Sequence, residues 1–426
     1  MTKTICVVGS GGREHALAEV LGRSAEVVVT PGSPAIPGSI AVDPIDVSAD
    51  LFVIGPEAPL VDGLADRLRA QGKLVFGPGA AGARLEGSKA WMKDVLVRAG
   101  VPTAAHATFS SLKPALSYLD SMSGLYVIKT DGLAAGKGVF ITEDLDEARH
   151  AVSSYLSGDA FGDAGRRIVI EEGLTGPELS VLAICDGTKA VALAPAQDFK
   201  RLSVGDSGPN TGGMGAYSPV PAASDDLVST IMRDAVEPTL ETLRAMGIDY
   251  RGVLYAGLML TPDGPKLLEY NVRFGDPETQ VVLPRLTSDL VQLLSEAAAG
   301  DLRSTPTFGA EAMVTVVCAA KGYPVAPLKG AIIEGIDEAR SIDGVSVFCA
   351  AVGVDSSGAM VVDGGRVLNV VGRGASVGEA RAKALAGVSK ISWPGMQFRT
   401  DIAATAEQII DLTMAESALT NEEVAR

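Results

Sequence analysis

The chain has 426 residues, of which 36 are basic and 52 acidic, so its formal net charge is −16. This charge disfavours a bulk polyanion, and we expect no nucleic acid among the partners. Hydrophobic residues make up 47% of the chain, which is enough for substantial cores, and the length predicts about three domains.

Cysteine usage and hydropathy indicate the compartment. Cys6, Cys185, Cys318 and Cys349 lie in apolar runs without the spacing of metal ligands, which predicts reduced core residues. The sequence shows no secretion signal, lipidation motif or apolar stretch long enough to span a membrane. We therefore expect a cytoplasmic protein with no membrane partner.

The first segment predicts a doubly wound unit that binds an anion. A buried strand over 4–8 leads into a glycine turn over 9–15 and a helix over 16–22, whose start can receive an anion. Because the third glycine of a dinucleotide-binding turn is missing, a compact phosphorylated substrate is favoured over NAD. The candidate residues are Gly11, Gly12, Arg13, Glu14 and His15.

Two further positions in this half of the chain point to ligands. Glu57 follows a strand over 51–54, at the carboxyl edge of the sheet where ligands collect, and a helix over 59–70 comes next. Ser88 caps a helix that runs to residue 99, and Lys89 in its first turn opposes the helix dipole. Either a bound anion or an ordinary surface lysine explains Lys89.

A glycine-rich loop between two strands predicts a nucleotide clamp. The apolar strand 125–128 delivers a lysine into the small-residue turn 131–138, and a second strand follows. Backbone N–H groups approach phosphates closely there, and lysines neutralise the charge. An ordinary hairpin is the alternative, but its turn would be shorter. The clamp residues are Lys129, Gly132, Gly136, Lys137 and Gly138.

Acidic residues after the clamp suit a nucleoside. Glu171 and Glu172 end a strand over 167–172, where extended backbone can bind an adenine edge, and Glu178 can accept from ribose hydroxyls. Without the clamp nearby, all three would be interpreted as solvated turn residues.

Residues 195–217 predict an irregular binding loop. Asp198 and Lys200 precede a run of glycines that contains Asn210, Thr211, Gly212 and Gly213, and many backbone donors are available there. A flexible linker is the alternative. We reject it, because linkers rarely interleave glycine with Met, Tyr and an Asp-x-Lys-Arg run.

Residues 267–273 place polar side chains on one face of a strand. Side chains alternate along a strand, so Leu268, Tyr270 and Val272 face the core, and Glu269, Asn271 and Arg273 form a row on the other side. The oxygens of Glu269 and Asn271 suit Mg²⁺, which takes few protein ligands beside ATP. Arg273 suits a substrate carboxylate or phosphate. A half-exposed edge strand is the alternative.

From about residue 306 the chain reads as a separate α/β unit that is poor in candidate catalysts. Strands are expected over 313–320, 345–352 and 366–371, and a helix over 377–388. We interpret this unit as a scaffold that closes the nucleotide site.

The motifs together resemble the glycinamide ribonucleotide synthetases, also called phosphoribosylamine-glycine ligases, of the ATP-grasp superfamily. The matching segments include GGREHALA at 11–18, LEGSKA at 85–90, DGLAAGKGV at 131–139, SGPNTGGMGAYSP at 207–219 and RFGDPETQ at 273–280. They cover the chain from the first strand to about residue 402.

The resemblance implies an α/β architecture with an ATP-grasp fold. It assigns an N-terminal doubly wound (Rossmann-like) domain to 1–86, an ATP-grasp domain to 87–305 with a mobile lid over about 107–173, and a C-terminal α/β domain to 306–402. Residues 403–426 lie beyond the match and are predicted to form an acidic helical tail.

The resemblance also implies the reaction. ATP with Mg²⁺ or Mn²⁺ drives ligation of glycine to 5-phosphoribosylamine through glycyl phosphate, which gives glycinamide ribonucleotide, ADP and phosphate. Small molecules are then the only expected partners, and the expected assembly is a monomer or weak homodimer. The rivals are an NAD-dependent oxidoreductase, a nucleotide sensor and a different ATP-grasp enzyme.

Site roles are carried over by position. ATP binding is assigned to Lys89, Lys129, Gly132, Gly136, Lys137, Gly138, Glu171, Glu172, Leu174 and Glu178, and the metal to Glu269 and Asn271. Substrate binding is assigned to Gly11, Gly12, Arg13, Glu14, His15, Glu57, Asp198, Lys200, Asn210, Thr211, Gly212, Gly213 and Arg273. Catalytic roles are expected for Arg273, Lys129 and Asp198. Phe199 and Cys349 stand where the family commonly has His, and we expect activity to survive both changes.

Overall fold

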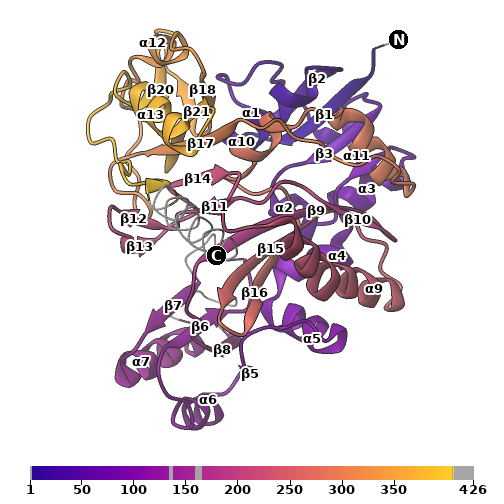
Figure 1. Cartoon of the computed structure of the whole chain (residues 1–426), viewed down its shortest axis with the longest axis vertical. Coiled ribbons are helices and arrows are strands. Elements are labelled where there is room, and N and C mark those ends of the chain that lie inside the picture. Colours follow the sequence, from indigo (N-terminus) through magenta and orange to yellow (C-terminus); the bar gives the residue numbers. More distant parts are fainter. Residues whose placement is uncertain (1, 134–137, 159–165, 405, 407–426) are drawn as a thin grey trace, which may run out of the picture.

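The computed structural model describes residues 2–133, 138–158, 166–404 and 406. Three four-stranded sheets and one five-stranded sheet form its framework, with helices packed around them (Figure 1). Within the described residues, every helix is too short or too polar to cross a bilayer.

The N-terminal segment forms a parallel sheet with the order β2-β1-β3-β4, flanked by helices. Its elements are β1 (Thr4–Gly9), α1 (Gly12–Leu21), β2 (Glu26–Pro31), η1 (Pro44–Asp46), β3 (Leu51–Ile54), α2 (Glu57–Val61), α3 (Leu64–Ala70), β4 (Val75–Phe76) and α4 (Ala80–Gly87). The predicted doubly wound arrangement is therefore present, with the carboxyl ends of β1 and β3 side by side.

Two helices of this segment differ from the prediction. Helix α1 begins at Gly12 and not at residue 16, because the Glu14 carboxylate accepts the Gly11 N–H at 2.6 Å and closes the first turn. The single helix expected over 59–70 is two helices, because Gly63 between them has a φ of +76°, a left-handed conformation that ends α2 and starts α3 in a new direction.

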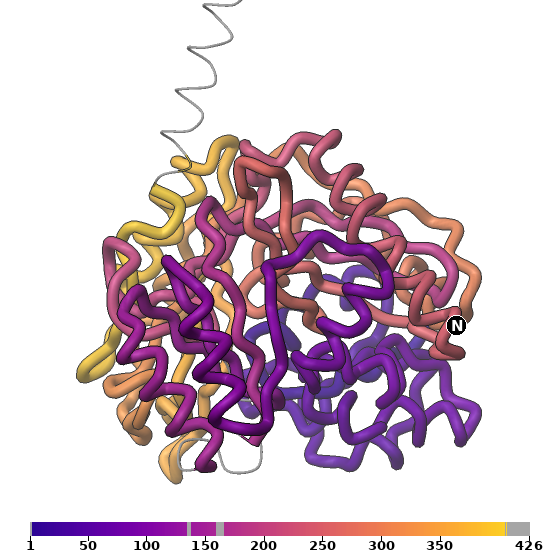
Figure 2. Tube along the Cα trace, turned by 90° about the horizontal axis from the view of Figure 1, so that it is seen from below, coloured from indigo at the N-terminus to yellow at the C-terminus, as the bar shows by residue number. Residues whose placement is uncertain are grey.

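The next segment builds a small separate sheet that we call the lid. Its order is β5-β8-β6-β7, with all pairs antiparallel, and α6 and α7 pack on it around Ile128, Val152 and Ile170. The lid is lowest in Figure 1 and nearest the viewer in Figure 2. Helix α5 (Lys89–Ala99) precedes the lid, whose elements are β5 (His106–Phe109), α6 (Leu112–Leu119), β6 (Tyr126–Thr130), β7 (Val139–Thr142), α7 (Leu145–Leu156) and β8 (Ile168–Glu172).

A second antiparallel sheet, with the order β10-β9-β15-β16, faces the lid and places β16 at its edge. The elements of this part are β9 (Glu178–Asp186), β10 (Ala190–Ala192), α8 (Asp225–Ile231), η3 (Met232–Val236), α9 (Glu237–Ala245), β15 (Arg251–Thr261), β16 (Gly264–Asn271), α10 (Thr279–Val282), η4 (Leu283–Arg285) and α11 (Leu290–Ala299).

Strand β16 contains a bulge that the alternation rule did not predict. Gly257 of β15 pairs with Glu269, and Leu258 pairs with Leu267, so Leu268 is the extra residue. Leu267, Tyr270 and Val272 are buried in the core, whereas Leu268 is only half-buried. The prediction was therefore wrong for Leu268 and right for the other two core positions.

The predicted irregular loop over 195–217 is made largely of short strands. They are β11 (Gln197–Asp198), β12 (Arg201–Ser203), β13 (Ser207–Asn210) and β14 (Gly215–Ser218). β12 and β13 form a hairpin, and β14 joins the last sheet of the chain by pairing with β17. Short paired strands were missed because glycine-rich sequence has little strand propensity of its own.

The C-terminal strands complete a five-stranded sheet with the order β11-β14-β17-β21-β18, with α13 packed against β21 and β17 (Figure 1). The elements are β17 (Ala312–Ala319), α12 (Ile336–Arg340), β18 (Val345–Cys349), β19 (Val352–Val354), β20 (Met360–Val362), β21 (Arg366–Gly374) and α13 (Val377–Val388). The strand expected over 345–352 ends at Cys349, and β19 starts a separate hairpin. Residues 197–218 and the C-terminal segment thus share one sheet.

The Gly63 conformation gives a stability prediction. A Cβ at Gly63 would meet nothing closer than 3.5 Å, so Gly63→Ala should cost only the left-handed backbone strain, about 1–2 kcal/mol of unfolding free energy. Gly309 is the control, because it has no positive φ and its nearest neighbour would lie at 3.7 Å. Urea unfolding should show destabilisation by Gly63→Ala and not by Gly309→Ala; equal midpoints for both variants would contradict the backbone argument.

Candidate functional site

The polar row of β16 lies at the centre of a cluster of charges. The Glu269 carboxylate makes no hydrogen bond or ion pair with any residue that the structure describes. Burial opposes its ionisation, but surrounding cations outweigh burial and lower the pKa of Glu269. Those cations are Lys200, Lys129, Lys89 and Arg273. An ionised carboxylate with free oxygens is thus held among four positive side chains.

Arg273 is fixed by two carboxylates and an amide. Its Nε donates to Glu57 at 3.0 Å, and its Nη2 donates to Glu86 at 3.0 Å and to the Asn271 Oδ1 at 3.3 Å. Burial opposes the charge, but Glu86 and Glu57 raise the pKa of Arg273 above its usual value. The guanidinium therefore stands beside the predicted metal ligands in a set orientation.

Sequence reasoning missed Glu86. Its Oε2 also accepts the backbone N–H of Val272 at 2.8 Å, so it ties the end of α4 to the end of β16 across 186 residues of sequence. It lies three positions before Lys89 in the LEGSKA motif, but nothing in that local pattern shows a partner so far along the chain.

A buried triad holds Lys129. One oxygen of Glu171 lies 3.0 Å from the Lys129 Nζ, and the other lies 3.1 Å from the Lys93 Nζ. Lys129 also donates to the Leu268 carbonyl at 3.2 Å. Burial lowers the pKa of Lys93 to about 8, against the opposing effect of Glu171. Lys93 was missed, although its place four residues after Lys89 on α5 puts both lysines on one helix face.

The triad limits what Glu171 can do for a nucleotide. Its side chain is 2% exposed and engaged by the two lysines, so only the backbone of this strand end is left to meet an adenine edge. Glu172 is anchored to Ala105 by two bonds of 2.9 and 3.0 Å. The N–H of Leu174 donates to no described residue, so it is free for a ligand.

Lys89 is half-buried and points toward the same cluster. Its Nζ donates to the Gly132 carbonyl at 3.5 Å. Burial lowers its pKa, Glu269 opposes that effect, and Lys129 adds to it. Such a position does not fit the alternative of an ordinary surface lysine. Gly136 and Lys137 of the predicted clamp lie outside the described residues, whereas the Gly138 carbonyl accepts the Thr130 N–H at 2.8 Å.

Lys200 and Asp198 form a second charged group near Glu269. Lys200 is ion-paired with Glu178 and lies 3.4 Å from the Asp198 Oδ1. Burial raises the pKa of Asp198 to about 7; Lys200 opposes this and Glu278 adds to it. Asp198 is therefore a carboxyl that can hold or release a proton near neutral pH.

The predicted loop 210–213 is attached to Lys200. Thr211 bonds the Lys200 carbonyl through its backbone N–H at 2.7 Å and its hydroxyl at 2.8 Å, and Gly213 donates to that hydroxyl at 3.0 Å. Asn210 pairs with Arg201 in the hairpin. The structure therefore brings the loop and the Asp198 group together.

The glycine turn of the N-terminal segment is filled by its own acidic residue. Glu14 is 2% exposed, and it lies 2.5 Å from Arg13. A Cβ at Gly9 would meet Glu14 at 2.5 Å, and one at Gly55 would meet it at 2.0 Å. Arg13 in turn donates to the Phe274 carbonyl at 3.3 Å, next to Arg273. Glu14 therefore shapes the turn, and Arg13 connects it to the charge cluster.

His15 points away from the turn. Its Nδ1 accepts the Cys349 N–H at 2.9 Å, and its ring meets Phe348 edge-on at 5.5 Å. Burial, with the charge of Arg340, lowers the pKa of His15 to about 4. The structure therefore places this residue in the contact between α1 and β18.

Phe199, which stands where the family commonly has His, packs against an aromatic ring and a cation. Its ring lies 6.2 Å from Tyr217 and carries the Arg399 guanidinium at 5.2 Å. Arg399 is 1% exposed and paired with Asp206 and Asp401 at 2.8 Å. The aromatic ring suits this stacked cation.

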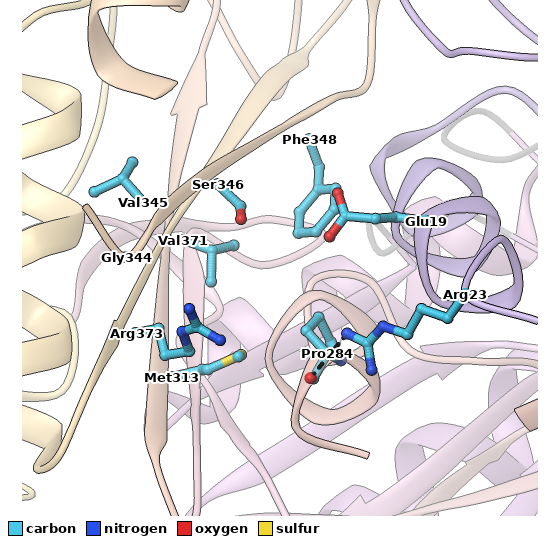
Figure 3. Close-up of a pocket in the computed structure, with 10 residues that line it drawn as sticks. All are labelled: Glu19, Arg23, Pro284, Met313, Gly344, Val345, Ser346, Phe348, Val371 and Arg373. Atoms are coloured by element: carbon cyan, nitrogen blue, oxygen red, sulfur yellow. Dashed lines mark hydrogen bonds between the residues drawn. The ribbon is translucent and has the colours of Figure 1, made fainter. Parts of the chain in front are cut away.

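A hollow of about 260 Å³ lies apart from the charge cluster, between α1, η4 and the strands of the C-terminal sheet (Figure 3). Arg23 and Arg373 reach toward it from opposite sides, Glu19 projects into it from the same helix as Arg23, and Phe348 points into it from above. It contains none of the predicted site residues. Arg23 is already engaged with the carbonyls of Pro284 and Leu286 at 3.0 Å.

The sequence and the fold resemble those of known proteins. Models of the N domain, the ATP-grasp (A) domain and the C domain of phosphoribosylglycinamide synthetase match residues 3–86, 87–279 and 313–405. The phosphoribosylamine-glycine ligase of Mesorhizobium japonicum is 46% identical over 415 residues, 93% of this chain and 97% of that one.

Two solved structures resemble this fold. The phosphoribosylamine-glycine ligase of Thermotoga maritima has a TM-score of 0.83 and 35% identity, and the match covers 94% of this chain and 100% of that one. The biotin carboxylase domain of the Hydrogenobacter thermophilus 2-oxoglutarate carboxylase, solved with MgADP, has a TM-score of 0.70 at 17% identity, over 93% and 92% of the chains, and shares the fold alone.

The His15 contact predicts a pH dependence of stability. The folded chain keeps His15 neutral down to a pKa of about 4, whereas the unfolded chain takes up a proton near pH 6.5. Stability from this group is full above pH 6.5 and falls as the pH drops from 6.5 toward 4, by about 1–2 kcal/mol at pH 5. His15→Asn keeps an acceptor for Cys349 and removes the titration.

Chemical unfolding at pH 7.5 and pH 5 measures this difference. The wild type should lose about 1–2 kcal/mol more than His15→Asn, and His150→Asn, which alters an exposed histidine of α7, should behave as the wild type. Equal losses for the wild type and His15→Asn would mean that His15 is not held neutral.

Proposed function

The chain belongs to the phosphoribosylglycinamide synthetase family, and we propose that its charge cluster around β16 performs the ligation that defines that family. The fold is α/β with an ATP-grasp domain, as the sequence predicted. The protein is a phosphoribosylamine-glycine ligase: it uses ATP to join glycine to 5-phosphoribosylamine in purine biosynthesis. Which residues carry each step is our proposal.

The phosphates of ATP are assigned to the lysines that face Glu269. Lys129 projects from β6 of the lid, and Lys89 projects from the first turn of α5. Both are held near Glu269 without a direct pair to it, and the single Glu171 carboxylate is shared by Lys129 and Lys93, so positive charge remains available to a polyphosphate. The backbone from Glu171 to Leu174 is assigned to adenine because its N–H at Leu174 is free.

Glu269 and Asn271 are assigned to the divalent cation. The two residues are two positions apart on β16, so their side chains lie on the same face. Glu269 is ionised and lacks a protein partner among the described residues. No group of three or more His, Cys, Asp and Glu in the described part of the chain could hold a metal by itself, so the remaining ligands would come from ATP and water. When bound, Mg²⁺ supplies charge neutralisation of the phosphates; Mn²⁺ is a proposed substitute.

In the first proposed step, the glycine carboxylate attacks the γ-phosphorus of ATP, which forms glycyl phosphate and releases ADP. Lys89 and Lys129 stabilise the charge that develops on the phosphoryl oxygens. Arg273, fixed by Glu57 and Glu86, orients the carboxylate for attack.

In the second proposed step, the amine of phosphoribosylamine attacks the acyl carbon and expels phosphate. Forming the amide releases a proton from nitrogen, and Asp198, with a pKa raised to about 7, can accept it beside Lys200. Arg13, which donates to the Phe274 carbonyl beside Arg273, and the start of α1 are assigned to the phosphate of this substrate, together with the loop 210–213.

The proposal also covers the domain bounds, the compartment and the assembly of the protein. The domains run over 1–86, 87–305 and 306–402, with the lid over about 107–173, and residues 403–426 form a tail that lies mostly outside the described residues. We place the enzyme in the cytoplasm, since all four cysteines are buried free thiols. We propose a monomer or weak homodimer without nucleic acid or membrane partners.

ADP release by the purified protein tests the function. We expect ADP only when ATP with Mg²⁺, glycine and freshly generated phosphoribosylamine are all present, with glycinamide ribonucleotide formed in equal amount. If ADP formed only with an acceptor other than phosphoribosylamine, the ATP-grasp fold assignment would stand and the substrate assignment would be overturned. Repeating the assay with Mn²⁺ compares the two metals.

Glu269→Gln tests the metal assignment. The substitution keeps the shape and removes the charge, so we expect kcat to fall about 100-fold or more while the unfolding midpoint stays near that of the wild type. Asp263→Asn is the control, because Asp263 is exposed in the turn of the same β15–β16 hairpin. A fully active Glu269→Gln would remove Glu269 from the site.

A further inference from the structure

A side chain from the C-terminal sheet reaches the acceptor side of the site. Arg366 begins β21, and its Nη1 donates to the Gly212 carbonyl at 2.5 Å and to the Asp276 carbonyl at 2.7 Å. Its Nη2 donates to the Asp276 carboxylate at 2.8 Å. These partners lie 154 and 90 residues away in the sequence, so one guanidinium joins three distant segments.

Neighbouring residues complete this junction. The Tyr323 hydroxyl accepts the Gly212 N–H at 3.0 Å, so the C-terminal segment binds both sides of the same peptide loop. The guanidinium packs flat on Gly212, where a Cβ would meet its Cζ at 3.0 Å. Asp276 is also held by Gln280 at 2.7 Å. Two nitrogens of the planar arginine fork share these three acceptors, a geometry that the single nitrogen of a lysine does not reproduce.

Arg366 bonds only to the loop and the turn assigned to the acceptor and makes no direct bond to a described residue assigned to ATP; the nearest link is indirect, through Lys200 to Glu178. From Gly212 the junction continues through Thr211, which bonds the Lys200 carbonyl, to the Lys200 and Asp198 pair. From Asp276 it continues to Arg273, three residues earlier on the same turn. Lys89 and Lys129, which are assigned to the phosphates of ATP, share no hydrogen bond or ion pair with Arg366 in the described part of the chain.

We propose that Arg366 is a positioning residue for the acceptor, which holds the loop 210–213 and the Asp276 turn in the geometry that binds 5-phosphoribosylamine. This inference rests on the proposed function of that loop. It gives the C-terminal domain a role beyond that of a scaffold, since one of its strands sets the shape of the acceptor pocket.

Substitution of Arg366 separates positioning from simple stabilisation. For Arg366→Gln we expect the KM for phosphoribosylamine and the Kd for its stable product glycinamide ribonucleotide to rise about tenfold or more, because the loop and the turn lose charge-assisted bonds. The KM for ATP should stay within about twofold. Arg366→Lys keeps the charge and should recover part of the loss.

Arg373→Gln is the matched control. Arg373 lies on the same strand, is 52% exposed and pairs only loosely with Glu311 at 3.7 Å, so all constants should remain those of the wild type. A merely structural role for Arg366 would lower the active fraction and leave each KM unchanged. That result, or an equal rise in the KM for ATP, would overturn the inference. A wild type that neither ligates nor binds glycinamide ribonucleotide would instead overturn the function on which it rests.

Discussion

The site depends on balancing positive charges that converge on one edge strand. Four cations surround Glu269, and like charges in a buried cluster repel one another unless carboxylates lie between them. Glu171 is buried between two lysines, and Glu86 with Glu57 holds Arg273. Of these four carboxylates, Glu269 alone has no direct partner among the described residues, so the arrangement is fixed in shape and leaves room for the cation and the polyphosphate that we propose.

Topology explains how this balance is built from distant segments. Strand β16 lies at the edge of its sheet, and Lys129 of the lid reaches its Leu268 carbonyl at 3.2 Å. The lid contributes Lys129, α5 contributes Lys89, and α4 contributes Glu86 from the N-terminal side. The five-stranded sheet then connects residues 197–218 to the C-terminal segment, which delivers Arg366 to the acceptor side. Each part of the chain thus supplies charge or geometry to one small region.

Local sequence predicted the strands and helices well where apolar periodicity and caps were clear. Helix α5 is an example, because Ser88 caps its first turn and Gly100 ends it at a φ of +68°. It failed where a single backbone feature overrode periodicity. Gly63 divides a helix, and the bulge at Leu268 shifts the strand face. The side-chain direction of His15 was also beyond local reasoning, because its partner is the backbone of Cys349, 334 residues away.

The sequence by itself determined the family, the strand that carries Lys129, and the row of Glu269, Asn271 and Arg273, because these depend on residue types at short, fixed spacing. Only the tertiary structure decided which charges neutralise one another. Pairing of Glu171 with Lys93, of Glu86 with Arg273, and of Asp276 with Arg366 depends on distances between segments that no local pattern encodes. Electrostatic energy depends on separation and burial, and both are set by the fold of the whole chain.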